Sequence, residues 1–90
     1  MFFVYILYSE SSDLFYVGHT SDIKNRLNRH NSGMENYTSK HLPWIVMCSI
    51  EKQTKSEAYQ LELKIKNLSK VRIKTFIEKY KTISNADEIA

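Results

Sequence analysis

The sequence contains few residues that constrain a chain covalently or sterically. Its 90 residues include one cysteine, one proline and two glycines. The cysteine, Cys48, cannot form a disulfide within this chain, and it lies inside the apolar run of residues 44–50. This pattern favours a buried thiol in a reducing compartment. We therefore expect a cytoplasmic protein that depends on its core rather than on cross-links.

Long hydrophobic runs are also missing. The most apolar stretch, residues 1–8, is too short to cross a bilayer and carries neither the basic flank nor the cleavage site of a signal peptide. The 42% of hydrophobic and 12% of aromatic residues are nevertheless sufficient for a folded core. The composition predicts one small globular domain without membrane association.

Several catalytic signatures are absent as well. The sequence shows no glycine-rich phosphate loop, no Cys/His zinc set and no GxSxG elbow. It also has no pair of acidic residues spaced for a two-metal centre within its predicted core. Among metal-assisted designs, only one ion held by few carboxylates fits this sequence.

The hydrophobic pattern predicts the element order β-β-α-β-α-α, an α/β (α+β) fold. Strands are expected over residues 2–8, 14–20 and 44–51, with the first strand central because it is apolar on both faces. The first two strands should form a hairpin. If Tyr5 lies opposite Tyr16, its tip falls at Glu10 and Ser11. We predict a domain over residues 1–80 and a C-terminal tail over residues 81–90.

Capping residues mark three helices. Ser21 is expected to cap a helix over residues 22–30, which buries Ile23 and Leu27 and exposes its polar side chains. Thr54 opens a capping box, and Ser69 can cap the last helix. The exposed residues of the first helix would be Lys24, Arg26, Asn28, Arg29 and His30, and the core-facing residues of the later helices Ala58, Leu61, Ile65, Leu68, Ile73, Phe76, Ile77 and Tyr80.

The formal net charge of +3 is modest, but the basic residues are unevenly distributed. They dominate the stretch from residue 61 to residue 81. This stretch could present a basic face to phosphate, or it could simply be a solvated lysine-rich surface. The basic residues are Lys64, Lys66, Lys70, Arg72, Lys74, Lys79 and Lys81, against Glu62 and Glu78.

Cleavage of a phosphodiester needs a base, a cation near the phosphorus and usually a carboxylate-bound metal. Arg26 and His30 are four residues apart, so they share a helix face. Glu62 adjoins a core stripe and could point inward, or it could pair with Lys66 on the surface. Each residue also has an ordinary structural explanation.

Tyr5 and Tyr16 could be core aromatics, and Gly18 could be a simple strand end or a place of close backbone approach. A catalytic phenol would need nearby cations to lower its pKa. The cations that could lower the pKa of a tyrosine in this way are Arg26, His30, Lys40 and His19.

Taken together, the motifs VYIL, YVGHT and DIKNRLNRHNSG resemble the GIY-YIG nuclease domain. The later YTSKHLPW and SEAYQLELKIKNLSK resemble its small stand-alone bacterial branch, the UPF0213 or YhbQ-like proteins. The resemblance covers residues 2–80. It implies a GIY-YIG fold with a small three-stranded antiparallel sheet flanked by helices.

The resemblance also implies metal-dependent cleavage of DNA, with one Mg²⁺ or Mn²⁺ ion. It suggests a role in repair or recombination, with specificity from DNA structure or from a protein partner. It implies that Glu62 binds the metal. The implied catalytic residues are Tyr5, Tyr16, Gly18, Arg26 and His30, and the expected DNA contacts are His19, Lys40, Lys64, Lys66, Lys70 and Arg72.

The sequence departs from the family pattern at a few positions. Val4 and Val17 replace residues of the name motif that carry no reactive group, and His19 stands where some relatives carry lysine. Asn67 is near the position of an asparagine that serves some members. Two alternative functions stay open, a non-catalytic nucleic-acid-binding module and an accessory subunit that docks a partner.

Overall fold

The computed structural model describes the backbone of residues 1–89 and the side chains of residues 1–80. The observed order confirms the predicted β-β-α-β-α-α arrangement and adds one short 3₁₀ helix, η1, within the expected loop. The elements are β1 (Phe2–Ser9), β2 (Leu14–Thr20), α1 (Ile23–Asn31), η1 (Thr38–His41), β3 (Trp44–Lys52), α2 (Lys55–Lys66) and α3 (Lys70–Ile89).

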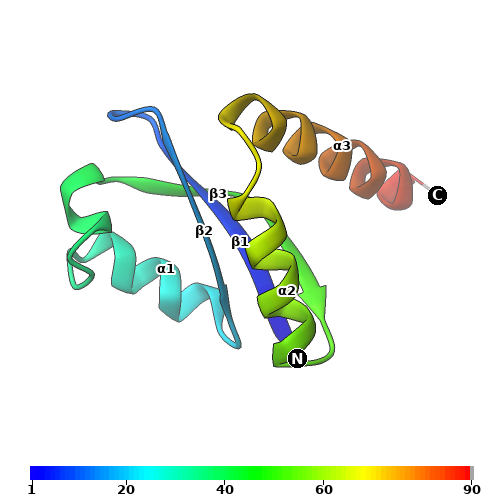
Figure 1. Ribbon diagram of the computed structural model, residues 1–90, viewed down its shortest axis with the longest axis horizontal. Coiled ribbons are helices and arrows are strands. Elements are labelled where there is room, and N and C mark those ends of the chain that lie inside the picture. The colour runs from blue at the N-terminus through cyan, green and yellow to red at the C-terminus, as the bar shows by residue number, and fades with distance from the viewer. Residues whose placement is uncertain (90) are drawn as a thin grey trace.

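The three strands form an antiparallel sheet in the order β2-β1-β3. β1 is central, as its apolar sequence predicts, and residues 4 to 7 are all buried. β2 and β3 are therefore edge strands. In Figure 1, α1 lies on one side of this sheet, and α2 and α3 lie on the other.

The hairpin register differs from the predicted one. Tyr5 lies opposite Gly18 rather than Tyr16, and Tyr16 lies opposite Leu7. The reason is the turn, in which Asp13 takes a left-handed φ of 53° and accepts a hydrogen bond of 2.7 Å from the Tyr8 hydroxyl. The pairing partner of Tyr5 moves by two residues, so each side chain keeps its face. Tyr5 and Tyr16 still share one side of the sheet.

Two different cores cover the two faces of the sheet. The face toward α2 and α3 is mainly aliphatic, whereas the face toward α1 is mainly aromatic. The alternation of side chains along β1 places Val4 and Ile6 in the first core and Tyr5 and Leu7 in the second. The aliphatic core also contains Val17, Cys48, Ala58, Ile65, Ile73 and Ile77, and the aromatic core contains Trp44 with Leu14, Tyr16, Ile23 and Leu27 packed on it.

The residues that cap the helices are those predicted from the sequence, except at the start of α1. Asp22, not Ser21, caps α1, because its side chain accepts the backbone N–H of Asn25 at 3.1 Å. The backbone of Asp22 is extended, so the helix begins one residue later than predicted. Thr54 caps α2 through the N–H of Glu57 at 3.2 Å, as the capping box predicts. The Ser69 hydroxyl accepts the N–H of Arg72 at 3.3 Å at the start of α3.

The segment between α1 and β3 is tied to the sheet at both of its ends. The indole N–H of Trp44 donates to the carbonyl of Thr38, the buried first residue of η1, at 2.8 Å. The side-chain amide of Asn31 bonds both backbone groups of Trp44, accepting its N–H at 2.7 Å and donating to its C=O at 3.0 Å. These hydrogen bonds therefore connect the segment to the start of β3.

α3 continues to Ile89, so the backbone is helical through most of the segment that we predicted as a tail. A helix whose first half packs on a core, here through Ile73 and Ile77, extends readily because each further residue adds one hydrogen bond. The side chains of residues 81–90 lie outside the described part, and the domain boundary after residue 80 stays a prediction. Among the described residues, no helix combines the length and apolarity needed to cross a bilayer.

Candidate active site

Gly18 makes room for the phenol of Tyr5. A Cβ atom at residue 18 would stand 2.6 Å from the Tyr5 hydroxyl and 2.8 Å from the ring carbon that carries it. No side chain fits in that space, so the glycine lets the Tyr5 ring cross from the central strand over β2. This contact explains the glycine without the close phosphate approach that the sequence suggested, and that approach stays a prediction.

His30 is buried, and the expectation that it lies exposed on α1 is wrong. Its side chain is 1% exposed, with Nε2 3.1 Å from the Tyr5 hydroxyl and Nδ1 2.9 Å from the Thr38 hydroxyl. The reason lies in the helical spacing, because His30 extends the stripe formed by Ile23 and Leu27 toward the sheet. A short hydrogen-bonded row, Tyr5–His30–Thr38, therefore lies between the sheet and α1.

Burial sets the charge state of this row. It raises the pKa of the Tyr5 phenol well above its ordinary value, and the neighbouring Tyr16 phenol raises it further, while Arg26 opposes both effects. Burial also lowers the pKa of His30; Glu35 opposes this effect, and Arg26 and Arg29 add to it. At neutral pH the row thus holds a protonated phenol beside a neutral imidazole.

Tyr16 is the more accessible of the two candidate tyrosines. It is half-buried, whereas Tyr5 is 2% exposed. Its ring centroid lies 4.9 Å from that of His30 in an edge-on contact and 6.3 Å from that of Tyr5. A substrate approaching this face would therefore meet Tyr16 before Tyr5.

Glu62 combines the two alternatives that the sequence left open. Its side chain is 9% exposed and points toward β2, where Oε1 lies 2.6 Å from Nδ1 of His19. Oε2 also pairs with Nζ of Lys66 at 2.9 Å, one helical turn away. Burial alone would raise the pKa of Glu62, but the hydrogen bonds from Lys66 and His19 together lower it. Glu62 is therefore an ionised carboxylate at neutral pH.

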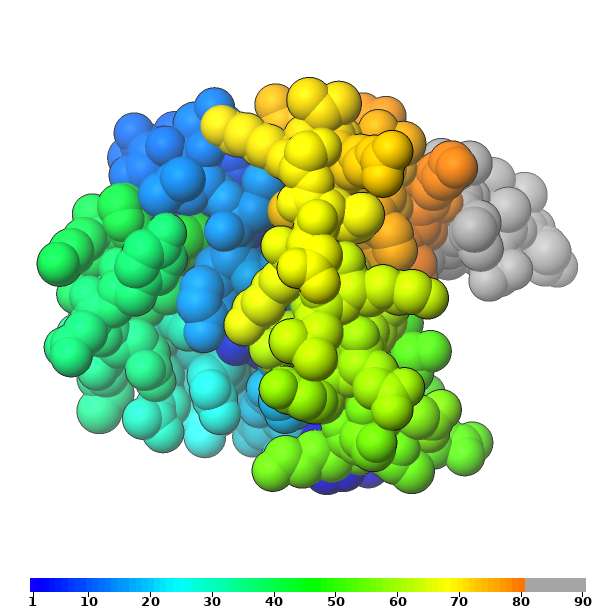
Figure 2. Space-filling view, in the orientation of Figure 1, coloured from blue at the N-terminus to red at the C-terminus, as the bar shows by residue number. Residues whose placement is uncertain are grey.

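The Tyr5–His30–Thr38 row and the Glu62–His19 pair lie on opposite faces of β2. Tyr16 and Gly18 face α1, and the alternation along the strand turns His19 toward α2. β2 therefore separates the Tyr5–His30–Thr38 row from the Glu62–His19 pair. Figure 2 shows the side chains of α2, in yellow-green, beside those of β2, in blue.

A hollow of about 190 Å³ opens where α1 and α2 begin. Arg26 from α1 and His19 from β2 line it together, so the structure brings these two predicted residues to one place. It adds Lys55, the first residue of α2, which the sequence did not single out because Lys55 stands inside the capping box. The other lining residues are Phe2, Thr20 and Ser21.

Thr38 is the second residue that the sequence did not single out. Its hydroxyl fixes the ring of His30, and its carbonyl accepts the indole N–H of Trp44. It lies in a stretch that the sequence predicts only as a loop, so no local signal identified it.

The described residues include no group of three or more His, Cys, Asp and Glu side chains that could hold a metal ion. Mg²⁺, however, is commonly bound through one or two carboxylates, with water and substrate phosphate as the other ligands. Glu62 fits that mode if the ion replaces the ammonium group of Lys66. Metal binding at Glu62 stays a prediction.

The predicted DNA contacts are dispersed over the surface. Lys66 pairs with Glu62, and Lys70 donates to Asp13, so these cations already have carboxylate partners. The remaining lysine and arginine positions, Lys40, Lys64 and Arg72, are exposed.

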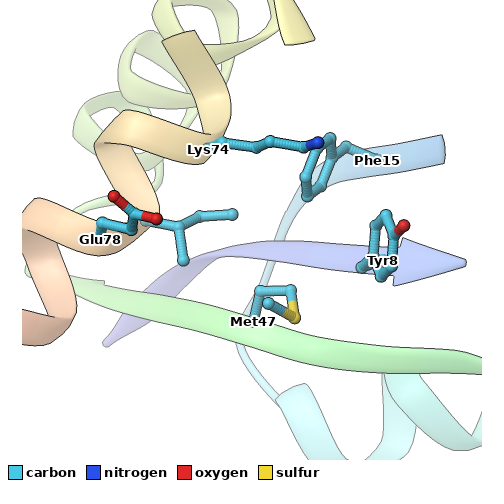
Figure 3. Close-up of a pocket in the computed structure, with 6 residues that line it drawn as sticks. Tyr8, Phe15, Met47, Lys74 and Glu78 are labelled. Carbon is cyan, nitrogen blue, oxygen red and sulfur yellow. The ribbon is translucent and has the colours of Figure 1, made fainter. Parts of the chain in front are cut away.

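A separate apolar cavity of about 320 Å³ lies between α3 and the sheet (Figure 3). Its lining includes Tyr8, Phe15 and Met47 from the strands, with Lys74 and Glu78 of α3 beside them. None of the predicted site residues lines this cavity. It is therefore distinct from the candidate active site.

Comparisons with known proteins agree with this geometry. Residues 1–81 match the model of the GIY-YIG catalytic domain. A UPF0213 protein of Bacillus velezensis is 36% identical over 78 residues, which cover 84% of this chain and 77% of that protein. A UPF0213 protein of Streptococcus agalactiae is 36% identical over 81 residues, covering 88% of this chain and 90% of the relative.

A solved structure is also similar. The solution NMR structure of a UPF0213 protein from Bacillus halodurans superposes with a TM-score of 0.56 at 29% identity, and the match covers 87% of this chain and 84% of that one. The small antiparallel sheet with flanking helices that the sequence predicts is thereby confirmed as a UPF0213-type fold.

Proposed function

Because the chain belongs to the GIY-YIG catalytic domain family, a nuclease family, we propose that it is a metal-dependent endonuclease that hydrolyses DNA phosphodiester bonds. The observation that carries this proposal is the arrangement of the candidate residues around β2. A buried Tyr5–His30 pair lies on one side, the Glu62–His19 pair lies on the other, and Arg26 borders the hollow at the end of the strand.

Arg26 is suited to the charge that develops on phosphorus. Its guanidinium group offers several N–H donors in a planar fork that matches phosphate oxygens. It is half-buried, so its field is screened less than that of a fully exposed cation. We assign it to stabilising the transition state.

The Tyr5–His30 pair can move a proton. The attacking water loses its proton to the Tyr5 oxygen while the Tyr5 hydroxyl proton passes to Nε2 of neutral His30, so the phenol never exists as a stable phenolate. The raised pKa of Tyr5 favours this relay over a resting phenolate base. Tyr16, the more accessible phenol, is assigned to orienting the water and the substrate.

Glu62 is the residue that would hold the ion, Mg²⁺ or Mn²⁺. When bound, such an ion polarises the phosphoryl oxygens and stabilises the leaving oxygen. His19 orients Glu62 in the absence of the ion through the 2.6 Å contact. We further propose that the enzyme acts on DNA structures that arise in repair or recombination.

The test is a cleavage assay on supercoiled, single-stranded and branched DNA with Mg²⁺, with Mn²⁺ and with a chelator. We expect Arg26→Ala and Glu62→Gln each to lower the cleavage rate by about 10²–10³-fold, because each removes a group that interacts with developing charge. Arg29→Ala and Glu57→Gln are matched controls on the exposed faces of the same two helices. Cleavage that is unchanged in Glu62→Gln would contradict the proposal.

A second function is favoured by one observation. Both carboxylate oxygens of Glu62 are already bonded, to His19 and to Lys66, which also suits a module that binds nucleic acid without cutting it. DNA binding that weakens steeply with salt, without cleavage under any metal condition, would support this alternative. Binding of a protein partner that is insensitive to salt would instead indicate an accessory subunit.

A further inference from the structure

Tyr37 is an exposed aromatic residue that directly precedes a buried, hydrogen-bonded one. Its side chain is 54% exposed, whereas the next residue, Thr38, is 1% exposed. Thr38 is fixed from two directions, by His30 through its hydroxyl and by Trp44 through its carbonyl. The backbone that carries the Tyr37 ring is therefore held by the buried row of the candidate active site.

The ring of Tyr37 continues a line of rings that starts inside the molecule. The Tyr16 centroid lies 4.9 Å from that of His30, and the Tyr37 centroid lies 6.4 Å from that of Tyr16, with an angle of 31° between the two planes. His41 follows at 5.2 Å from Tyr37. The line leads from the proposed proton relay to the surface within the spacing of neighbouring aromatic rings.

The stretch of chain that leads to Tyr37 and follows it is basic. From the start of α1 to the end of η1 it carries Lys24, Arg26, Arg29 and Lys40 against the single carboxylate of Glu35. Of these cations, Arg29 pairs with Glu35 at 3.4 Å. An exposed aromatic ring among cations suits an anionic ligand that also has a flat apolar face.

We propose that Tyr37 is a stacking platform for an unpaired nucleobase of DNA, next to the phosphate that the candidate active site receives. This inference rests on the proposed function and deepens it, because it names single-stranded or unpaired DNA as the preferred ligand. In a duplex both faces of each base are covered by neighbouring bases, so an exposed ring gains contact only with a base that has left the stack. Lys24 of α1 and Lys40 of η1, both exposed, then contact the flanking phosphates.

The test measures DNA binding in the presence of a chelator, so that cleavage does not occur. Fluorescence anisotropy compares a labelled oligothymidylate, the same strand with abasic nucleotides, and a blunt duplex of equal length. The variants are Tyr37→Ala, Tyr37→Phe, which keeps the ring, and Val71→Ala, a control that shortens another exposed apolar side chain, on α3.

We expect Tyr37→Ala to weaken binding of the oligothymidylate about 5- to 100-fold, the range that loss of one stacked base produces. Tyr37→Phe and Val71→Ala should bind like the original protein. Tyr37→Ala should leave the affinities for the duplex and for the abasic strand unchanged.

An equal loss for duplex and single strand, or no loss for either, would overturn the stacking platform and leave the proposed nuclease intact. Absence of DNA binding by the unaltered chain would overturn both. Stacking with no cleavage in the metal-dependent assay would overturn the nuclease alone and support the platform.

Discussion

The two faces of the sheet are built from different chemistry. Toward α2 and α3 the buried residues are mainly aliphatic, and the polar pair His19–Glu62 lies only at the β2 edge. Toward α1 the buried residues are aromatic and polar, with Tyr5, His30 and Thr38 joined by hydrogen bonds. Side chains alternate along β1, so a single central strand serves both faces.

The aliphatic core and the hydrogen-bonded row are expected to contribute differently to stability and to catalysis. Aliphatic packing is non-directional and tolerates small shifts, whereas a buried hydrogen-bonded row must keep its geometry to remain satisfied. Among the described residues, every buried side-chain nitrogen and oxygen has a hydrogen-bond partner. We therefore expect mutations in the aliphatic core to change mainly the free energy of unfolding, and mutations in the Tyr5–His30–Thr38 row to change the response to pH and the reaction as well.

The largest effect on stability is expected on the aliphatic face. Ile65 is 1% exposed, so Ile65→Ala should lower the free energy of unfolding by about 2–5 kcal/mol through lost burial and a cavity. Urea unfolding followed by circular dichroism measures this change. Leu63→Ala, on the same helix but 42% exposed, should cost far less. Equal costs for the two variants would contradict the assignment of Ile65 to the buried aliphatic core.

An intermediate effect on the free energy of unfolding is expected at Gly18, where the Tyr5 ring crosses β2. Gly18→Ala should cost about 1–3 kcal/mol, because its new methyl group would overlap the Tyr5 phenol. Truncating the phenol in Tyr5→Leu should remove most of that cost, so the double variant should be more stable than the sum of the single effects predicts.

Gly33→Ala provides the control for this cycle. Residue 33 has a φ of +80°, and a Cβ atom added there would lie 3.9 Å from its nearest neighbour, the Cβ atom of Ser39. The cost of this substitution therefore comes from the backbone and should not depend on Tyr5. Coupling of Tyr5 to residue 33 as strong as its coupling to residue 18 would show that the contact is not specific.

The smallest effect on the free energy of unfolding is expected from the protonation of His30. Its pKa is lowered in the folded protein, so below its ordinary value of about 6.5 the unfolded chain binds a proton that the folded chain does not. The stabilisation is complete above that pH and is lost as the pH falls. The slope is at most about 1.4 kcal/mol per pH unit.

Unfolding measured from about pH 7.5 to about pH 5.5 tests this expectation. His30→Gln should flatten the profile, whereas His41→Gln, whose ring bonds the exposed Ser12, should retain it. The lowered pKa of Glu62 acts in a separate window, because its contribution is lost only as the pH falls through a value below 4.5. An unchanged slope in His30→Gln would show that another group controls the profile.

The sequence predicted features that depend on local spacing. The central position of β1 follows from an apolar run, and the place of Glu62 beside Ala58, Leu61 and Ile65 made an inward direction one of its two alternatives. The capping box at Thr54 was also correct. These signals lie within a few residues of one another, so no knowledge of the tertiary structure was needed.

Features that depend on distant contacts were missed or misread. The hairpin register is set by a left-handed Asp13, and the burial of His30 depends on hydrogen-bond partners that Tyr5 and Thr38 bring from other elements. His30 does continue the Ile23 and Leu27 stripe, and that spacing was an available signal. A histidine is usually assigned to the surface because burying it without partners is costly.

The amide of Asn31 has a consequence for how copies of this protein meet. It occupies the N–H and C=O of Trp44, the first residue of the edge strand β3. A strand that added to this edge as far as the first residue of β3 would have to break both bonds. Asn31 thus takes the hydrogen bonds that a fourth strand would make at this end of β3, beside the exposed Ile45 and Val46, and it disfavours extension of the sheet there.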